Sequence, residues 1–343
     1  MPSEELTPEA TIASAGEHAL IRHIRARLSP APEWLVVDVG DDAAVYEPQR
    51  NVLEVITTDA IVDGVHFDRR FTPASAIGHR ALAVNLSDLA AMGADARLAT
   101  VSMALPQTLK LQDFEQIVDG LLVLAERTHT RIVGGNITAT PGPLVIDVTA
   151  IGTVGRRRVL TRAGARPGHY VFVSGNLGDA RAGLAQIRED RAGTASQSSD
   201  LVARYLQPEP RLRLGQQLGR NQAATSAIDL SDGLADGLHQ LATASGVGFE
   251  IDADAMPIRD DTREYWRSAN RDAVQEAVSG GDDYELLFTV HPRRLGRLRT
   301  VRRLIGGLEL ARIGVVTRTP GVDIIHGDGR RQPVGAGYEH FAS

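Results

Sequence analysis

Five short aspartate clusters constrain this chain more than any other feature, because they lie among glycine, serine, threonine and apolar residues. A solvated acidic surface would instead scatter Asp and Glu along polar helix faces. Carboxylates held close together repel one another unless cations join them, and hard divalent cations with oxygen ligands do that best. The pattern therefore favours a fold that gathers metal ions where strands end and helices begin. The clusters are Gly40-Asp41-Asp42, Thr57-Thr58-Asp59, Asn85-Leu86-Ser87-Asp88, Asp229-Leu230-Ser231-Asp232-Gly233 and Gly280-Gly281-Asp282-Asp283-Tyr284-Glu285.

Composition excludes several classes of protein. Lys110 is the single lysine, which excludes a Walker A loop and the strand lysine of protein kinases. The net charge of -6 gives no reason to expect nucleic acid or an anionic membrane as partner. The chain has no cysteine, so disulfides, thiolate nucleophiles and zinc–sulfur sites are excluded. No apolar run reaches the length of a membrane span and the start, Ser3-Glu4-Glu5, is not a signal peptide, so a cytoplasmic protein is expected.

Length and periodicity indicate two domains. At 343 residues the chain is long for one core, and Gly155-Arg156-Arg157-Arg158 is the best boundary. Domains of residues 1–157 and 158–343 are therefore expected, each mixing strand-like and helical periods in an α/β fold with mixed sheets. The predicted strands include 35–39, 52–56, 98–105, 131–133, 144–154, 170–174, 227–229, 248–251, 286–290 and 311–316, and the predicted helices include 74–92, 113–128, 178–189, 210–219 and 232–244.

Several of these motifs allow both a functional and a purely structural interpretation. Asp88 is the strongest functional candidate, since a carboxylate among Ala, Val and Leu is costly unless it is paired or metal-bound. Gly134-Gly135-Asn136 after a short strand would let the backbone approach a ligand, although it is also a good turn. Ser231 could equally be a helix N-cap with Asp232 in the first turn. His66 taken alone could be an ordinary half-buried histidine.

Taken in order, the segments resemble the thiamine-monophosphate kinases, members of the aminoimidazole ribonucleotide synthetase superfamily. The resemblance covers nearly the whole chain, up to Tyr338. Its most specific parts are Asn85-Leu86-Ser87-Asp88-Leu89-Ala90-Ala91-Met92-Gly93-Ala94 and Gly280-Gly281-Asp282-Asp283-Tyr284-Glu285-Leu286, and the other matching segments are Gly40-Asp41-Asp42, Thr57-Thr58-Asp59, Asp63-Gly64-Val65-His66-Phe67, Leu160-Thr161-Arg162 and Asp229-Leu230-Ser231-Asp232-Gly233.

The resemblance implies several bound magnesium ions, ATP as co-substrate, thiamine monophosphate as substrate and N-terminal domains that pair in a homodimer. The N-terminal domain would bind ATP and metal, and the C-terminal domain would complete the active-site cleft. By resemblance, the metal ligands are Asp41, Thr57, Thr58, Asp59, Asp88, Asn136, Asp229 and Asp232; the ATP-binding residues are Gly135, Asn136, Arg162 and Ser231; and the substrate-binding residues are His66, Asp282 and Tyr338.

Asn136 is the one departure from the family pattern, which usually has aspartate at this position. The amide oxygen can still coordinate magnesium but brings no charge. The metal affinity expected at this position is therefore lower, while the rest of the set is intact.

The implied reaction is direct in-line phosphoryl transfer from ATP to thiamine monophosphate, which yields ADP and thiamine diphosphate. The acceptor is already a phosphate, so no acid–base residue or covalent nucleophile is assigned. Transfer would depend on magnesium and Arg162. Two alternatives remain: another ATP-using synthetase of the same superfamily, or a protein that binds nucleotide or thiamine phosphate without turnover. Within the superfamily, the lack of cysteine argues against selenophosphate synthetase and the carbamoyl-transfer maturation protein.

Overall fold

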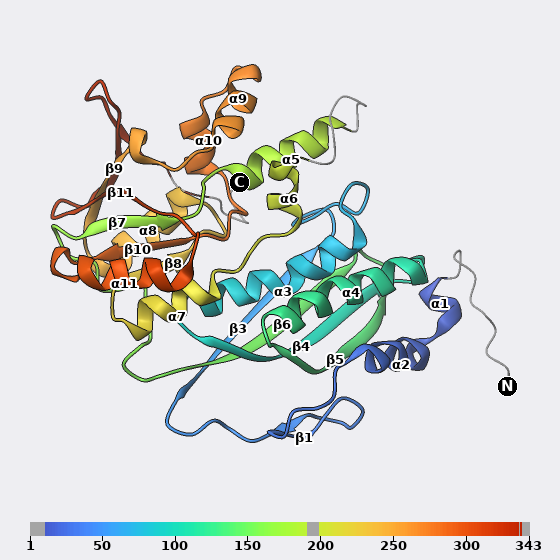
Figure 1. Cartoon of the computed structure of the whole chain (residues 1–343). Helices are drawn as coiled ribbons and strands as arrows, with labels where there is room; N and C mark the ends of the chain where they lie inside the picture. The colour runs from blue at the N-terminus through green and yellow to red at the C-terminus, as the bar shows by residue number, and fades with distance from the viewer. Residues whose placement is uncertain (1–10, 191–198, 336, 338–343) are drawn as a thin grey trace. The chain divides into compact units, whose positions relative to one another are not determined.

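The computed structural model describes residues 11–190, 199–335 and 337, and its chain divides into two compact units (Figure 1). The first unit takes the chain up to Asn85 together with Ala96–Thr153. The second takes Leu86–Asp95 and the chain from Val154 onward. Each unit combines a sheet with helices, so the fold is mixed α/β with mixed sheets, as predicted. No described helix is both long enough and apolar enough to cross a membrane.

In the first unit, α3 and α4 lie across one face of a four-stranded sheet of order β3-β6-β4-β5 (Figure 1). Helix α4 turns apolar residues inward at helical spacing, with Phe114, Ile117, Leu121 and Leu124 all buried. The elements are α1 Ile12–Ala15, α2 Glu17–Arg27, β1 Leu35–Val37, β2 Val45–Tyr46, β3 Leu53–Val62, α3 Ala74–Ala91, β4 Asp95–Pro106, α4 Leu111–Arg127, β5 Arg131–Thr140 and β6 Val145–Val154, of which α3 and β4 also contribute residues to the second unit.

Strand β6 confirms the predicted alternation, because Ile146, Val148 and Ala150 are buried and the residues between them are half-buried. Two other predictions here are wrong. Thr57-Thr58-Asp59 does not end a strand but lies within β3, and Gly134-Gly135 does not follow a strand but lies within β5. The pairing of β5 with β4 explains the second error, since its register shifts after Ile132 and then continues in parallel to Thr140.

The second unit is built on a seven-stranded sheet of order β13-β12-β9-β11-β7-β10-β8. Most neighbouring strands are antiparallel, but β12 and β9 run parallel, which makes the sheet mixed. Its elements are β7 Tyr170–Ser174, α5 Asp179–Asp190, α6 Asp200–Leu206, α7 Leu212–Arg220, β8 Ser226–Asp229, α8 Leu234–Ser245, β9 Gly248–Asp252, α9 Asp260–Ser268, α10 Ala273–Ser279, β10 Leu286–Val290, α11 Leu295–Ile305, β11 Leu310–Thr317, β12 Gly321–Ile325 and β13 Arg331–Pro333, with the 3-10 turns η1 Ala253–Ala255 and η2 Pro292–Arg294.

One edge of this sheet gathers the segments that carry the aspartate motifs. Leu286, the first residue of β10, pairs with Asp229 at the end of β8. Leu310, the first residue of β11, pairs with Ser174 at the end of β7. The loops after β7 and β8 and the loops before β10 and β11 therefore emerge together at this edge.

Helices α3 and α4 approach so closely that each has a glycine at the crossing. A Cβ built on Gly78 would lie 1.8 Å from the carbonyl oxygen of Ile117, and one built on Gly120 would lie 1.9 Å from that of Ser75. These atoms are backbone, so a side chain at either position would force the helices apart. The first unit therefore depends on glycine at both positions.

We expect Gly78→Ala to lower the free energy of unfolding of the first unit by about 1–3 kcal/mol, the usual cost of overpacking. Differential scanning calorimetry of the whole chain measures the change. Gly296→Ala on α11 is the matched control, because a Cβ there meets nothing within 4 Å. This substitution should raise stability slightly, by up to about 1 kcal/mol. Equal effects at both positions would contradict the close crossing.

Candidate functional site

Ser87 joins two of the aspartate motifs in the second unit. Its hydroxyl donates a 2.7 Å hydrogen bond to Oδ2 of Asp229, across 142 positions of sequence. Both side chains are buried, with Ser87 at 0% and Asp229 at 6% exposure. A hydroxyl donor to a carboxylate in such surroundings stabilises the charged form and holds its orientation. The end of α3 is therefore fixed to the end of β8.

The loops that contain Ser231 and Asp282 form a short hydrogen-bonded pair. The amides of Asp282 and Tyr284 donate to the carbonyls of Ser231 at 2.8 Å and Leu230 at 3.0 Å, and the amide of Leu230 donates to the carbonyl of Glu285 at 2.8 Å. The predicted ATP-binding Ser231 and the predicted substrate-binding Asp282 therefore lie on directly bonded segments.

Glycine is required where these loops touch. A Cβ on Gly233 would lie 2.4 Å from the carbonyl oxygen of Gly280, and one on Gly281 would lie 2.6 Å from that of Ser231. Asp282 and Tyr284 have positive φ angles of 70° and 49°, which cost energy in residues other than glycine and persist only when surrounding contacts hold them. The loop conformation that presents Asp282 is thus maintained by its neighbours.

Asp283 anchors that loop to the start of α5. Its carboxylate accepts hydrogen bonds from the amides of Gly178, at 2.8 Å, and Ala180, at 3.3 Å. Burial raises the pKa of the Asp283 carboxyl well above its ordinary value; the two amide hydrogen bonds oppose the shift, and the charges of Asp179 and Glu285 add to it.

Glu285 anchors the same loop on its other side. Its carboxylate, 4% exposed, accepts hydrogen bonds from Nε of Arg211 at 2.7 Å and from the hydroxyl of Ser174 at 2.5 Å. The pairing is bidentate, since Nη2 of Arg211 also donates to Glu285. Removal of one partner from a buried pair of this kind strongly destabilises the folded protein, because the other charge stays buried without a counter-charge.

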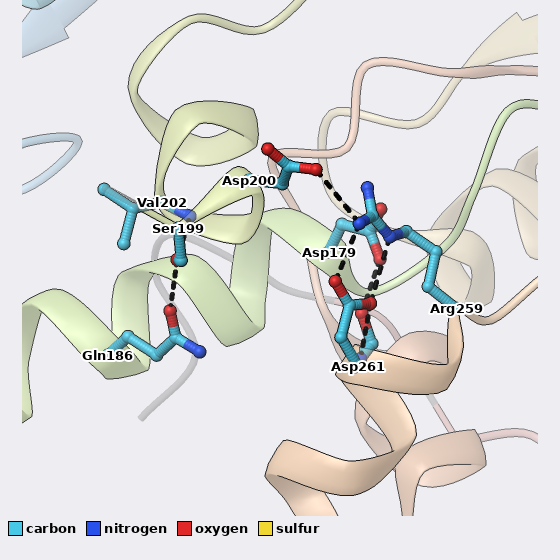
Figure 2. Close-up of polar contacts among 8 residues, drawn as sticks. Asp179, Gln186, Ser199, Asp200, Val202, Arg259 and Asp261 are labelled. Carbon is cyan, nitrogen blue, oxygen red and sulfur yellow. Dashed lines mark hydrogen bonds and ion pairs between the residues drawn. The ribbon is translucent and has the colours of Figure 1, made fainter. Parts of the chain in front are cut away.

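The start of α5 is held in turn by α9. Figure 2 shows Asp179, whose Oδ1 accepts a 2.6 Å hydrogen bond from the hydroxyl of Thr262, with Arg259 between Asp200 and Asp261. Burial raises the pKa of Asp179, against the Thr262 hydrogen bond and the charge of Arg259. Asp283 is therefore bonded to the N-terminal turn of α5, and α9 holds that turn in place.

The start of α8 differs from the sequence-based expectation. Helix α8 begins at Leu234 with Gly233 as N-cap and no side-chain capping bond, so Ser231 is not the cap and Asp232 precedes the helix. The tight contact with Gly280 occupies the position where an earlier helical turn would lie. Ser231 and Asp232 therefore belong to the loop, and both are half-buried.

Arg162 lies on the surface of the second unit and is held by α8. Its guanidinium donates to Oε1 of Gln240, whose amide bonds to Asp236 one turn earlier. Its backbone carbonyl accepts a 3.3 Å hydrogen bond from Ser245. The predicted ATP-binding cation is thus attached to the helix that follows Asp232.

In the first unit, β3 separates the three predicted metal ligands between its faces. Side chains alternate along a strand, so Thr57 and Asp59 share one face and Thr58 points to the other. The Thr58 hydroxyl donates to Oδ1 of Asp147 at 3.0 Å. Thr57 and Asp59 can therefore supply oxygen ligands to the same metal ion, whereas the Thr58 side chain is directed to the opposite face. Asp41 is exposed, and one of its oxygens accepts the amide of Asp42 at 2.9 Å.

His66 and Asn136 also belong to the first unit. Nδ1 of His66 accepts a 3.1 Å hydrogen bond from the amide of Val62, which places the ring proton of the neutral form on Nε2. Asn136 is exposed on β5 opposite Ser102 of β4. Gly135 is glycine for a packing reason, since a Cβ there would lie 1.8 Å from the carbonyl oxygen of Val101.

The remaining predicted residues are less fully placed. Asp88 is half-buried on α3 beside the buried Leu89, and Tyr338 lies outside the described residues. Among the residues that the structure describes, no group of three or more His, Asp or Glu side chains could by itself hold a metal ion. The predicted donors are divided between the two units, so the metal assignments stay predictions.

Sequence reasoning named Asp229 and Asp282 but not the residues that hold them. The motifs contain Ser87, Asp283 and Glu285 but do not indicate a role for them, and no motif contains Arg211. One signal was available, because Leu86-Ser87-Asp88 echoes Leu230-Ser231-Asp232. The others make contacts too distant in sequence for spacing to indicate.

This fold and these motifs define the class. Residues 40–154 match the family described as AIR synthase related protein, N-terminal domain, and residues 166–327 match AIR synthase related protein, C-terminal domain. The chain therefore belongs to the AIR synthase related proteins.

Individual relatives identify a narrower group. The thiamine-monophosphate kinase of Escherichia coli K12 is 37% identical over 336 residues, which is 96% of this chain and 99% of the relative. The crystal structure of thiamine-monophosphate kinase from Stenotrophomonas maltophilia K279a is 38% identical with a TM-score of 0.80, covering 92% of this chain and 98% of the other. A structure of AaThiL complexed with AMPPCP and TMP is 31% identical with a TM-score of 0.75, covering 95% and 97%. The chain is a member of the thiamine-monophosphate kinase family, ATP-binding enzymes of thiamine biosynthesis.

Asp283 should make stability depend on pH. Because its pKa is raised in the folded state, its contribution is fully present below the ordinary value of 3.8 and is lost as pH rises through the folded pKa. We expect Asp283→Asn to flatten the decline of unfolding free energy with rising pH above about 4. Denaturant unfolding across pH 4–8 measures the slope, with the exposed Asp260→Asn as control. Parallel slopes in all three proteins would contradict this assignment.

Proposed function

We propose that this chain transfers the γ-phosphoryl group of ATP directly to the phosphate of thiamine monophosphate, producing ADP and thiamine diphosphate. The observation that carries the proposal is the direct bonding of three motifs in the second unit. Ser87 bonds Asp229, and the loop of Ser231 bonds the loop of Asp282. The family assigns metal to Asp229, ATP to Ser231 and substrate to Asp282, so these contacts would align donor and acceptor.

The proposed metal is magnesium, in several ions. The candidate ligands fit a hard cation, because they are carboxylate, hydroxyl and amide oxygens in a chain without cysteine. Bound magnesium would screen the charges of the two polyphosphates during transfer. The buried Asp229, already oriented by Ser87, is the most preorganised of these ligands. The proposed set is Asp41, Thr57, Asp59, Asp88, Asn136, Asp229 and Asp232; the predicted Thr58 is left out, because its hydroxyl donates to Asp147 on the opposite face of β3.

The remaining roles are binding and orientation. Arg162, held on α8 by Gln240, would contact the ATP phosphates, together with Gly135, Asn136 and Ser231. His66, with Nδ1 engaged by Val62, would donate from Nε2 to thiamine monophosphate and not transfer protons. Asp282 and Tyr338 would complete the substrate site. No general base is needed, because the acceptor phosphate is nucleophilic at neutral pH.

We further propose that the first domain binds ATP and metal, that the second completes the active-site cleft, and that two chains pair through their N-terminal domains. The outer face of the four-stranded sheet carries Ile56, which is 65% exposed, and Thr58, which is exposed beside Asp147. A single exposed apolar residue is common on protein surfaces, so the pairing is inferred from the family resemblance. Light scattering at micromolar concentration should give the mass of two chains, and a monomeric mass would refute the pairing.

A coupled ADP-release assay with and without thiamine monophosphate tests the function. ADP release that requires this substrate supports the kinase. ATP use that requires another acceptor would favour a different synthetase of the superfamily, and tight binding without turnover would favour a binding protein. Asp88→Asn should nearly abolish turnover while the melting temperature stays close to that of the wild type. The exposed Asp260→Asn should change neither quantity.

Asn136 should set the magnesium requirement. A neutral amide weakens a cation site but also relieves repulsion among clustered carboxylates. We expect Asn136→Asp to lower the magnesium concentration that gives half-maximal activity, and Asn136→Ala to impair ATP use more than thiamine-monophosphate binding. Magnesium titrations of the three proteins measure this. Superimposable curves would leave Asn136 a strand residue outside the site.

A further inference from the structure

A cavity of about 510 Å³ lies in the second unit, and none of its lining residues is among the predicted metal-, ATP- or substrate-binding residues. Its walls come from the end of β7, the segment that joins α6 to α7, and the turn between α11 and β11. The volume falls within the range of small-molecule sites, roughly 300–1,000 Å³. Gly306 and Gly307, both exposed, form part of the lining.

Arginine dominates the polar lining of this cavity. Arg204, Arg211 and Arg213 all line it, in a chain whose net charge is -6. Arg211 forms an ion pair with Glu285, and the charge of Glu209 also stabilises its charged form. The side chains of Arg204 and Arg213, by contrast, form no hydrogen bond or ion pair with any residue that the structure describes, although the charge of Arg204 also acts on Asp179 and lowers the pKa of that carboxyl.

The carboxylates of the lining do not cancel these two cations. Glu209 acts on Arg211, and Glu309 is an exposed residue whose backbone carbonyl accepts the amide of Gly175 at 3.0 Å. The lining therefore holds three arginines against two glutamates, and guanidinium pairs with phosphate through strong bidentate hydrogen bonds.

Arg204 and Arg213 both lie on well-fixed helices. Figure 2 shows Ser199 at the start of α6, where its hydroxyl donates to Gln186 of α5 at 2.6 Å, while Asp200 pairs with Arg259. A Cβ on Gly183 of α5 would lie 2.0 Å from the carbonyl oxygen of Leu201, so α5 and α6 pack at backbone distance. Helix α7, which carries Arg213, buries Leu212 and Leu214 on either side of it.

We propose that this cavity binds a small phosphate-bearing anion through Arg204 and Arg213, at a site separate from the reaction site. Arg211 connects the two, because its guanidinium lines the cavity and also holds Glu285 of the substrate loop. An anion in the cavity competes with Glu285 for Arg211 and loosens the loop that presents Asp282. The expected consequence is a lower affinity for thiamine monophosphate, and this consequence rests on the proposed function. The anion site itself does not depend on the proposed function.

Binding is tested by isothermal titration with inorganic phosphate in EDTA, so that magnesium cannot hold the anion at the reaction site. The proteins are the wild type, Arg204→Gln/Arg213→Gln, and the control Arg293→Gln/Arg299→Gln, which removes two exposed arginines outside the cavity. The wild type and control should bind phosphate, and the cavity variant should bind at least tenfold more weakly. Equal affinities in all three, or no binding to the wild type, would overturn the site.

Coupling is tested by steady-state kinetics with and without phosphate. Phosphate should raise KM for thiamine monophosphate in the wild type and in the control, and leave kcat unchanged. The factor of this increase should be at least twice the factor measured for the cavity variant. Identical responses would overturn the coupling, even where titration shows the site. Absence of turnover in every protein would refute the proposed kinase activity, whereas the titration would still report on the anion site.

Discussion

Carboxylates brought close together must each find a donor or a cation, and the second unit is organised by that constraint. Asp229 receives the hydroxyl of Ser87, Asp283 receives two amides at the start of α5, and Glu285 receives Arg211 and Ser174. Each of these contacts also ties a loop at the sheet edge to another element. The hydrogen bonds and the ion pair that stabilise these acidic groups are therefore also the contacts that position the candidate site.

The same loops need glycine for steric reasons that are separate from ligand binding. Gly233 and Gly281 let the two loops approach within backbone hydrogen-bonding distance, and Gly135 lets β5 lie against β4. Glycine-rich motifs in this family are readily interpreted as ligand cradles. In this chain the nearest atoms to these three positions are carbonyl oxygens of the protein itself. Close backbone packing therefore brings the segments of Asp282 and Ser231 together.

The two anchors of the loop that carries Asp282 differ in kind. Asp283 is held by neutral amide donors, and burial raises its pKa, whereas Glu285 is held by the charged Arg211. One anchor of the loop is therefore a carboxyl with a raised pKa, and the other is a buried ion pair. Asp282, between Gly281 and Asp283, depends on both anchors because its positive φ persists only when surrounding contacts hold it.

The sequence by itself determined the family, the mixed α/β class and the elements with strong local patterns. The apolar spacing of α4, the alternation of β6 and the run of β10 predict those elements because side-chain periodicity is a local property. The limits of β3 and β5 required the tertiary structure, since pairing with neighbouring strands carries both through residues that look like turns. The contacts of Ser87 with Asp229 and of Arg211 with Glu285 join residues 142 and 74 positions apart. No local pattern encodes such contacts, because they form only when folding of the sheet brings its loops to one edge.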